Sequence, residues 1–234
     1  DGEAQRKSLG LRLAASRRSA FTQLASGVHV ILAELGMPKA TIHLVENSEL
    51  EPNSHGTIHQ EIHVSTNPGQ KPGSIRDIAS GGEASRLMLA ISATLASADR
   101  VPLMVFDEVD SGVGGRLGAV IGGKLAKLGH GRTVLVVTHT PHVAAFGVRH
   151  YAVRKHQGDV DTWVEVQEVS NDDRASEIAE MLGGGVPAHL QAQELLAAAR
   201  KGTPKGGSEI KIVAPSPATF DRKMPAKTIN KVRR

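Results

Sequence analysis

Residues 103–110 read Leu-Met-Val-Phe-Asp-Glu-Val-Asp, and this stretch decides the fold class of the chain. Four apolar residues in a row after Pro102 predict a strand buried on both faces, as in the parallel sheet of an α/β domain. The strand ends at Asp107 and Glu108, and Asp110 follows. Ionised side chains at the end of a buried strand are costly unless a cation or a reaction uses them. Ligands of open α/β sheets bind beyond the carboxyl ends of the strands, so these residues form a candidate site; a solvated acidic turn is the alternative.

The chemistry that this strand end favours is nucleotide hydrolysis. An aspartate in the position of Asp107 can hold Mg²⁺, usually through water, in nucleotide-binding folds. A neighbouring glutamate, here Glu108, can then orient and deprotonate the water that attacks a γ-phosphate.

A glycine-rich helix start lies upstream, at Ser80-Gly81-Gly82-Glu83. Apolar residues from Leu87 onward predict a helix from Glu83 to about Ser97. Glycines allow close approach of an anion, and the helix N-terminus offers free N–H groups and a positive dipole end. Ser80 can act as the helix cap or as a phosphate donor; an ordinary capped helix start would also explain the motif.

A second apolar strand lies downstream, at residues 133–137, and it ends at Thr138-His139. A histidine there can bond to a γ-phosphate or to the attacking water. Because the chain has eleven histidines, an ordinary loop histidine is the alternative.

In this order, the three motifs resemble those of the ABC-type ATPases: a signature motif, a Walker B strand with a catalytic glutamate, and a switch histidine. Asp110-Ser111-Gly112 stands in the D-loop position. Over roughly residues 1 to 200, the chain resembles the C-terminal portion of the RecN family of SMC-like bacterial DNA-repair ATPases. The runs that carry this resemblance are residues 65–70, 79–86, 105–113, 137–144 and 181–184.

The resemblance implies ATP sandwiched between two paired heads of a homodimer. Asp107 would hold Mg²⁺, Glu108 would be the general base and His139 would sense the γ-phosphate. Asp110 would couple the two sites. The signature residues of one head would face the ATP held by the other head, and they are Ser80, Gly81, Gly82 and Glu83.

The same resemblance implies action on DNA ends in recombinational double-strand break repair, with the RecA recombinase as a further partner and a cytoplasmic, nucleoid-associated location. A non-catalytic head-pairing module and another SMC-like or ABC cassette are the alternatives.

Composition is that of a soluble globular protein, with 40% hydrophobic and 22% charged residues in 234. Without cysteine, the chain can form neither disulfides nor thiolate metal sites, which fits a cytoplasmic protein. The first residue is Asp1 rather than Met, so we expect that an N-terminal part is missing.

Residues 1–36 predict one long helix, because apolar residues recur at three- and four-residue steps up to Gly36. A plain amphipathic core helix is the alternative to what the resemblance implies, the returning end of a coiled-coil arm. Residues 40–66 predict two strands joined by a turn. His59 and His63 would share a face only on a helix, so we do not expect a metal site there.

A false phosphate-binding loop follows the acidic strand. Residues 118–124 have the spacing of such a loop, but Leu125 stands where Ser or Thr should contact Mg²⁺. Helical spacing continues through the segment, so we predict a helix interior. With no phosphate loop elsewhere, we expect the chain alone to bind ATP poorly and to be inactive, and we expect a missing N-terminal head segment to supply the Walker A loop.

Beyond the histidine strand, the sequence predicts a hairpin over residues 148–169 and two helices over 171–182 and 188–200. Residues 201–234 carry nine Lys or Arg against two acidic residues, with four prolines and no sustained periodicity, which indicates a disordered tail. Non-specific attraction of this tail to DNA is one interpretation. A merely solvated tail and a non-native end of the reading frame are the alternatives.

We therefore predict an α/β fold: the C-terminal lobe of an ABC/SMC-type ATPase head, a P-loop NTPase-like sheet flanked by helices, with an N-terminal coiled-coil helix. The predicted domains are the arm helix (1–36), the head lobe (37–200) and the basic tail (201–234).

Overall fold

The computed structural model describes residues 2–47, 53–78, 80–157, 162–202 and 209–215. The chain divides into two compact units, Asp1–Asp99 and Arg100–Arg234, which we describe separately. The division falls inside the predicted head lobe, so the signature motif and the acidic strand lie in different units. No helix within the described ranges is long and apolar enough to cross a membrane.

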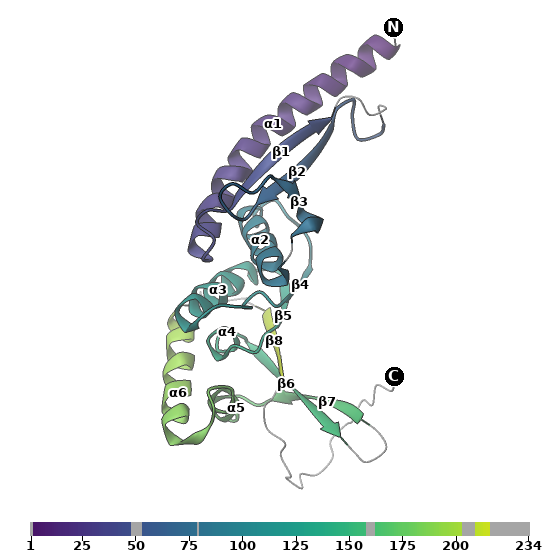
Figure 1. Cartoon of the computed structure of the whole chain (residues 1–234). Helices are drawn as coiled ribbons and strands as arrows, with labels where there is room; N and C mark the ends of the chain where they lie inside the picture. Colours follow the sequence, from purple (N-terminus) through teal and green to yellow (C-terminus); the bar gives the residue numbers. More distant parts are fainter. Residues whose placement is uncertain (1, 48–52, 79, 158–161, 203–208, 216–234) are drawn as a thin grey trace. The chain divides into compact units, whose positions relative to one another are not determined.

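The first unit combines two helices with an antiparallel sheet of order β1-β2-β3 (Figure 1). The long helix α1 (Gly2–Glu34) confirms the prediction of one long helix at the start of the chain, and Leu9, Leu11 and Leu13 in its first half are exposed. The other elements of this unit are β1 (Thr41–Asn47), β2 (His59–Ser65), β3 (Gly73–Ser74), the 3₁₀ turn η1 (Ile75–Asp77) and α2 (Gly81–Thr94).

Helix α1 is joined to both neighbours by specific contacts. A Cβ added to Gly27 would lie 2.6 Å from Cγ2 of Thr94, so the absence of a side chain lets α1 approach α2 closely. Arg18 donates to both carboxylate oxygens of Glu46 on β1, at 2.7 and 2.9 Å. These hydrogen bonds lower the pKa of Glu46, with a further contribution from Gln60.

The second unit is built on a five-stranded sheet of order β4-β5-β8-β6-β7. The first four strands are parallel and β7 runs antiparallel to β6, so the sheet is mixed and the α/β prediction is confirmed. The elements of this unit are β4 (Leu103–Asp107), α3 (Gly115–Leu128), β5 (Thr133–Val137), α4 (Pro141–Ala144), β6 (Arg149–Gln157), β7 (Thr162–Val169), α5 (Arg174–Met181), α6 (Gly185–Gly202) and β8 (Glu209–Pro215).

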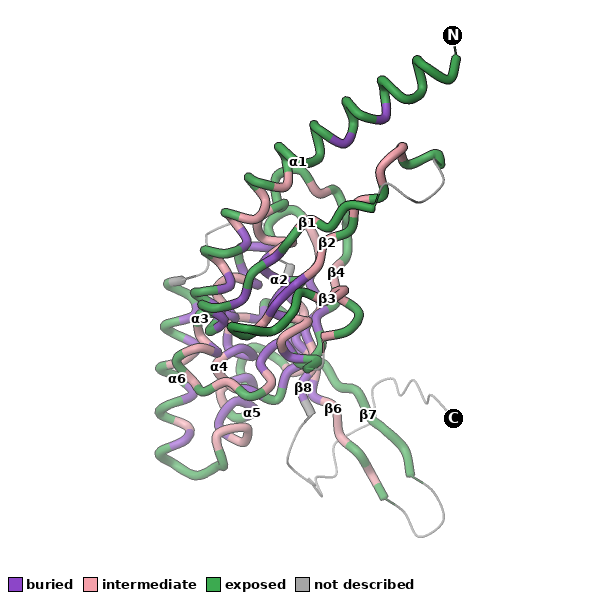
Figure 2. The backbone as a smooth tube through the Cα atoms, turned by 45° about the horizontal axis from the view of Figure 1, so that its top comes forward, coloured by how far each residue is buried: buried purple, intermediate pink, exposed green. Residues whose placement is uncertain are grey.

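The four helices of this unit lie on one side of the sheet, and the core forms between them and that face (Figures 1 and 2). Alternate strand residues are buried there, namely Phe106, Val134, Val136, Ala152, Ile210 and Ile212. A second cluster packs α5 against α6 through Ile178, Ala192 and Leu196. Strand β7 is exposed over nearly its whole length (Figure 2).

The prediction that residues 103–106 are buried on both faces is wrong. Leu103 and Val105 are 52% and 59% exposed, whereas Phe106 is 5% exposed. Strand β4 is the edge strand of the sheet, and its residues alternate between the helix-covered face and a face without helices in the second unit. A continuous apolar run therefore marks a strand with two apolar faces, of which only one is covered here.

The false phosphate loop is a helix interior, as predicted, because residues 118–124 lie within α3. Its glycines serve helix packing. A Cβ on Gly118 would lie 3.1 Å from Cβ of His142, and one on Gly122 would lie 2.4 Å from Cδ2 of Phe146. Small residues at this spacing let α3 lie against the α4 segment.

The predicted disordered tail is wrong for residues 209–215, which form β8 in the middle of the sheet. Ile210, Ile212 and Ala214 alternate along this strand and are buried. The rest of the tail, residues 203–208 and 216–234, lies outside the described residues. No group of three possible metal ligands occurs in the described parts of the chain.

The close packing at Gly122 predicts opposite effects at two neighbouring positions. We expect Gly122→Ala to lower the free energy of unfolding by about 1–3 kcal/mol, because the Phe146 ring has to shift. Gly123→Ala is the control: its Cβ would lie an ordinary 3.8 Å from Phe146, and alanine favours a helix over glycine by up to about 1 kcal/mol. Urea denaturation of both variants measures the difference, and equal stabilities would contradict this packing.

Burial of His150 on β6 predicts a pH dependence of stability. Its side chain is fully buried, neither ring nitrogen has a hydrogen-bond partner in the described part of the chain, and burial lowers its pKa to about 4, helped by the charge of Arg174. The unfolded chain binds the proton below about pH 6.5, so stability is full above that pH and decreases as pH falls toward 4, by roughly 3 kcal/mol in all.

Urea denaturation between pH 7 and pH 4.5 tests this in the wild type and in His150→Leu. The variant should show a smaller decrease over this range, because it has no proton to gain on unfolding at this position. Parallel curves for the two proteins would show that His150 does not control this part of the pH dependence.

Candidate functional site

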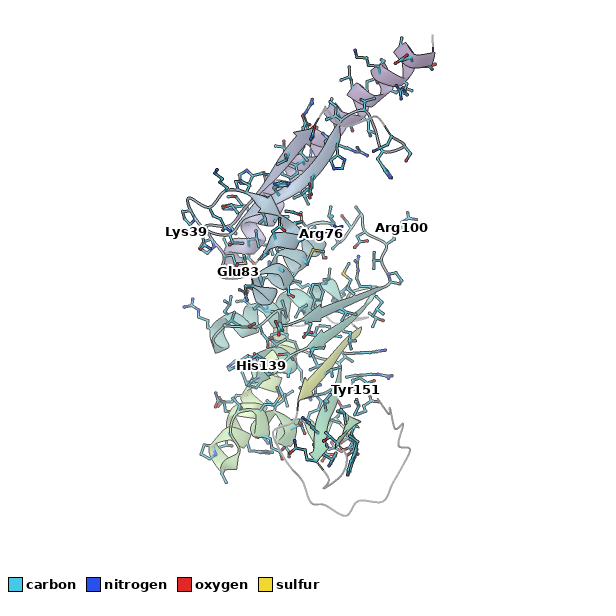
Figure 3. The ribbon with its side chains drawn as sticks, turned by 45° about the vertical axis from the view of Figure 1, so that its right-hand side comes forward. Lys39, Arg76, Glu83, Arg100, His139 and Tyr151 are labelled. Atoms are coloured by element: carbon cyan, nitrogen blue, oxygen red, sulfur yellow. The ribbon has the colours of Figure 1, made fainter. Side chains whose placement is uncertain are left out.

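The predicted Walker B and switch residues meet at one edge of the sheet in the second unit. Parallel pairing of β4 with β5 places Asp107 opposite Val137. Glu108 and Thr138 are the next residues of the two strands, so Glu108 and His139 leave the sheet at the same edge. Figure 3 labels His139 at this position. The structure thus places Asp107, Glu108, Asp110 and His139 at the same edge of the sheet.

Glu108 has an unusual backbone conformation. Its φ is +55°, and it is the sole non-glycine residue with positive φ in the described ranges. A side chain in this region costs about 1–3 kcal/mol and persists where the surrounding structure enforces it, which is frequent at functional sites. A turn enforces it here: the carbonyl of Glu108 accepts from Ser111 N at 2.9 Å, and Gly112 follows with φ +72°.

A buried hydrogen-bond network holds the two strand ends together. Asp110 is 1% exposed, and its Oδ2 accepts a hydrogen bond from Thr138 Oγ1. The same hydroxyl accepts from the backbone N–H of Thr140 at 3.0 Å. His139 lies between these two buried threonines and is itself exposed. The network therefore fixes the backbone on both sides of His139.

Sequence reasoning did not identify Thr138 and Thr140 as part of the site. Thr138 and Asp110 are 28 positions apart, and no local pattern indicates that they pair. Asp110, which the resemblance places in the D-loop, accepts the bond that anchors Thr138, the residue before His139.

The signature residues lie in the first unit, at the start of α2. Ser80 is the N-cap, as one of the two interpretations expected: its Oγ accepts from Glu83 N at 3.5 Å, and its carbonyl accepts from Ala84 N at 3.0 Å. Ser80 and Gly81 are exposed and Gly82 is buried. Figure 3 labels Glu83 on this helix; Ala79 lies outside the described residues.

The carboxylates fit a magnesium ion that is bound mainly by a nucleotide. Asp107 and Glu108 are adjacent and exposed, and both offer hard oxygen donors. The described residues contain no cluster of three ligands that would hold a metal by itself. Mg²⁺ in nucleotide sites takes one or two carboxylates together with phosphate oxygens and water, and this edge can provide that number.

The network at Thr138 predicts different effects of two similar substitutions. Thr138→Val keeps the shape but leaves the buried Asp110 carboxylate without its donor, which should lower the free energy of unfolding by about 1–3 kcal/mol. Thr138→Ser keeps the hydroxyl and should lower the free energy of unfolding by clearly less than Thr138→Val. Urea denaturation compares the two variants, and a serine variant as unstable as the valine variant would show that the hydroxyl is not what matters.

No protein-family profile matches the chain, whereas individual relatives do. The chain is 42% identical over 190 residues to the DNA repair protein RecN of Xylella fastidiosa strain 9a5c, covering 79% of this chain and 34% of that protein. It is 40% identical over 191 residues to RecN of Deinococcus radiodurans, covering 81% and 34%. For RecN of Streptomyces coelicolor the identity is 35% over 207 residues, covering 82% and 36%.

Solved SMC head structures are also similar, at lower identity. One is the Smc head of Pyrococcus furiosus with an extended coiled coil, bound to the C-terminal domain of ScpA; it is 20% identical with a TM-score of 0.46, covering 71% of this chain and 39% of that chain. Another comes from work on ATP-driven dimerization of SMC ATPases, with 19% identity, a TM-score of 0.43, and coverage of 74% and 98%.

The sequence matches confirm the resemblance inferred from the motifs. The chain spans about a third of the length of the curated relatives it matches. The chain is therefore similar in sequence to RecN DNA repair proteins, and a match to a third of their length agrees with the expected C-terminal portion.

Proposed function

We propose that the chain is part of an ATPase that binds and hydrolyses ATP between two paired heads in order to act on DNA during recombinational double-strand break repair. The observation that carries this proposal is the sheet edge where the strained Glu108, the neighbouring Asp107 and the anchored His139 lie together. Strand-end carboxylates with a nearby histidine are suited to activating a water beside a phosphate.

In this proposal Glu108 is the general base. The oxygen of a water molecule attacks the γ-phosphorus while its proton moves to a carboxylate oxygen of Glu108. The bond between the γ-phosphorus and the β–γ bridging oxygen breaks, and ADP leaves with the electron pair. His139 donates to a γ-phosphate oxygen, and the Thr138–Asp110 bond keeps its backbone in place.

Asp107 provides a carboxylate for Mg²⁺, which neutralises phosphate charge when it is bound. The start of α2 acts separately, because its free N–H groups and the exposed Ser80 and Gly81 would meet the γ-phosphate held by the opposite head of a homodimer. Asp110 would couple the two sites at that interface.

The phosphate-binding loop has to come from a segment outside this chain. The face of the sheet without helices supports this requirement, because parallel sheets are normally covered on both faces. Leu103 and Val105 are more than half exposed on that face. A missing N-terminal head segment that brings a Walker A loop would also bring a helix to cover them. We therefore expect no ATP hydrolysis by the chain alone.

We further propose DNA ends as the target, RecA as a partner and a cytoplasmic, nucleoid-associated location, as the motif resemblance implies. The name of the relatives, DNA repair protein RecN, supports a role in DNA repair. A non-catalytic head-pairing role for the same fold is the competing function, and the following experiment separates the two.

The experiment uses a chimera in which this chain replaces the matching portion of Xylella fastidiosa RecN. Glu108→Gln should lower the ATP hydrolysis rate by about 10²–10⁴-fold and leave ATP affinity nearly unchanged, because only the proton acceptor is lost. Asp107→Asn should instead weaken Mg²⁺-dependent ATP binding. Asp172→Asn, an exposed carboxylate at the start of the α5 region, is the control and should change neither quantity.

Hydrolysis rates and nucleotide affinities of the three variants give the answer. Equal loss of binding in the Glu108 and Asp107 variants would show that the two carboxylates are assigned wrongly. A chimera that pairs its heads with ATP but never hydrolyses it would favour the non-catalytic function.

A further inference from the structure

The loop that carries His139 continues directly into α4, a helix of only four residues. A helix of this length is not stable by itself, since even isolated helices of about 12–15 residues are marginal in water. The orientation of α4 therefore depends on its contacts with other elements. Its N-cap, Thr140, is held by the Thr138 hydroxyl described above.

Arg174, the first residue of α5, holds the opposite end of α4. Its Nη2 atom donates to the backbone carbonyls of Ala144 and Ala145, each at 3.3 Å, and α5 lies beside α4 (Figure 1). These carbonyls form the C-terminal end of α4, where helix carbonyls lack partners within the helix and carry partial negative charge. The guanidinium of Arg174 therefore caps α4 from a neighbouring helix.

The position of Arg174 is unfavourable for α5 itself. A cation in the first turn of a helix opposes the helix dipole. The side chain is buried, its Nε has no hydrogen-bond partner in the described residues, and burial, with a contribution from the charge of Arg200, lowers the pKa of its guanidinium. Replacing buried charges by apolar side chains of similar size is often neutral or stabilising. The stability of α5 therefore does not explain this arginine, whereas its bonds to α4 do.

A second arginine nearby, Arg154 on β6, has different partners. It donates to Oε2 of Glu177 on α5 at 2.9 Å and to Oε1 of Gln167 on β7 at 3.1 Å. These bonds tie α5 to the β6–β7 hairpin, and neither partner belongs to α4. Loss of Arg154 would leave the buried Glu177 carboxylate without its cation, which is strongly destabilising. Arg154 is therefore a matched control for Arg174.

We propose that Arg174 is a positioning residue for ATP hydrolysis: by binding the C-terminal end of α4, it fixes the direction in which the preceding loop presents His139 to the γ-phosphate. The inference rests on the role of His139 in the proposed function. Ala144 and Ala145 follow His139 by five and six residues, so Arg174 acts through the backbone of α4 and not by contact with the nucleotide.

Anchors at both ends define the orientation of α4. The bond between Thr138 and Asp110 fixes the start of the loop, and packing at Gly118 of α3 adds a contact beside Thr140. Without Arg174, the last turn loses two charge-assisted hydrogen bonds, so α4 can shift about its N-terminal anchor. Misplacement of a reacting group by about 1 Å can slow a reaction roughly 100-fold. We therefore expect loss of Arg174 to slow hydrolysis without weakening ATP binding.

Amide hydrogen exchange of the full chain tests the anchoring without nucleotide. The amides of residues 144–147 form hydrogen bonds in and just after α4. Arg174→Met keeps an extended side chain but removes the donor, so these amides should exchange at least about ten-fold faster. Arg154→Met should change their exchange by less than about three-fold, although urea denaturation should show a lower stability. Arg174→Gln is too short to reach the same carbonyls and replaces the methionine variant if that variant does not fold.

The Xylella fastidiosa RecN chimera described above tests the effect on hydrolysis. Arg174→Met should lower kcat by about 10–100-fold and change KM for ATP by less than about two-fold. Arg154→Met should change neither constant. In the His139→Ala background, Arg174→Met should lower kcat by less than about two-fold further, because a residue that acts through His139 has no effect once His139 is removed.

Each other result overturns the inference. Unchanged exchange at residues 144–147 in the Arg174 variant would show that Arg174 does not anchor α4. Equal losses of kcat in the Arg174 and Arg154 variants would show a general effect of destabilisation, and additive losses from Arg174→Met and His139→Ala would show that Arg174 does not act through His139. A chimera that hydrolyses no ATP, or hydrolyses it equally well with His139→Ala, would contradict the proposed function and with it the positioning role, even where exchange confirms the anchor.

Discussion

The parallel pairing of β4 with β5 is the interaction on which the candidate site depends. It aligns Asp107 with Val137, and everything that follows the two strands then has to leave at the same edge. The polar groups at this edge are the adjacent carboxylates at the end of β4 and the histidine loop that follows β5. A shift of the register by one residue would turn Phe106 away from the helices and separate Asp110 from Thr138, so core packing and site geometry are specified by the same pairing.

Two features of this edge of the sheet lower the stability of the folded chain. Glu108 adopts a left-handed backbone conformation, and Asp110 is buried with one carboxylate oxygen bonded to Thr138 and the other without a partner in the described residues. Each of these features is unfavourable by itself. The surrounding turn, with its bonds from Ser111 and Val113, and the short α4 segment after Thr140 offset them. Such a concentration of cost is expected where geometry matters more than stability.

Much of this arrangement was predictable from sequence because it depends on local patterns. Apolar runs ending in polar residues located β4 and β5, and helical spacing through residues 118–124 identified α3 despite its glycines. Contacts distant in sequence were not predictable: nothing in the sequence pairs Thr138 with Asp110. Strand β4 is buried on one face because helices cover only that face. An apolar run such as residues 103–106 does not indicate how many faces of a strand are covered. Strand β8 was missed because the charge and prolines of the whole tail concealed the short alternation of Ile210, Ile212 and Ala214.

The strands of the second unit's sheet are all paired, whereas one face of this sheet carries no helix of that unit. A strand has to pair with both β5 and β6 in the centre of the sheet, since unpaired backbone groups there are costly. Any short strand with apolar residues at alternate positions can do so. β8 meets that requirement with a sequence that contributes nothing else to the site. Covering the bare face and supplying phosphate ligands are two further requirements. A unit of strand, loop and helix meets these two together with the pairing requirement. A strand that is sufficient for pairing is therefore not by itself sufficient for the proposed function.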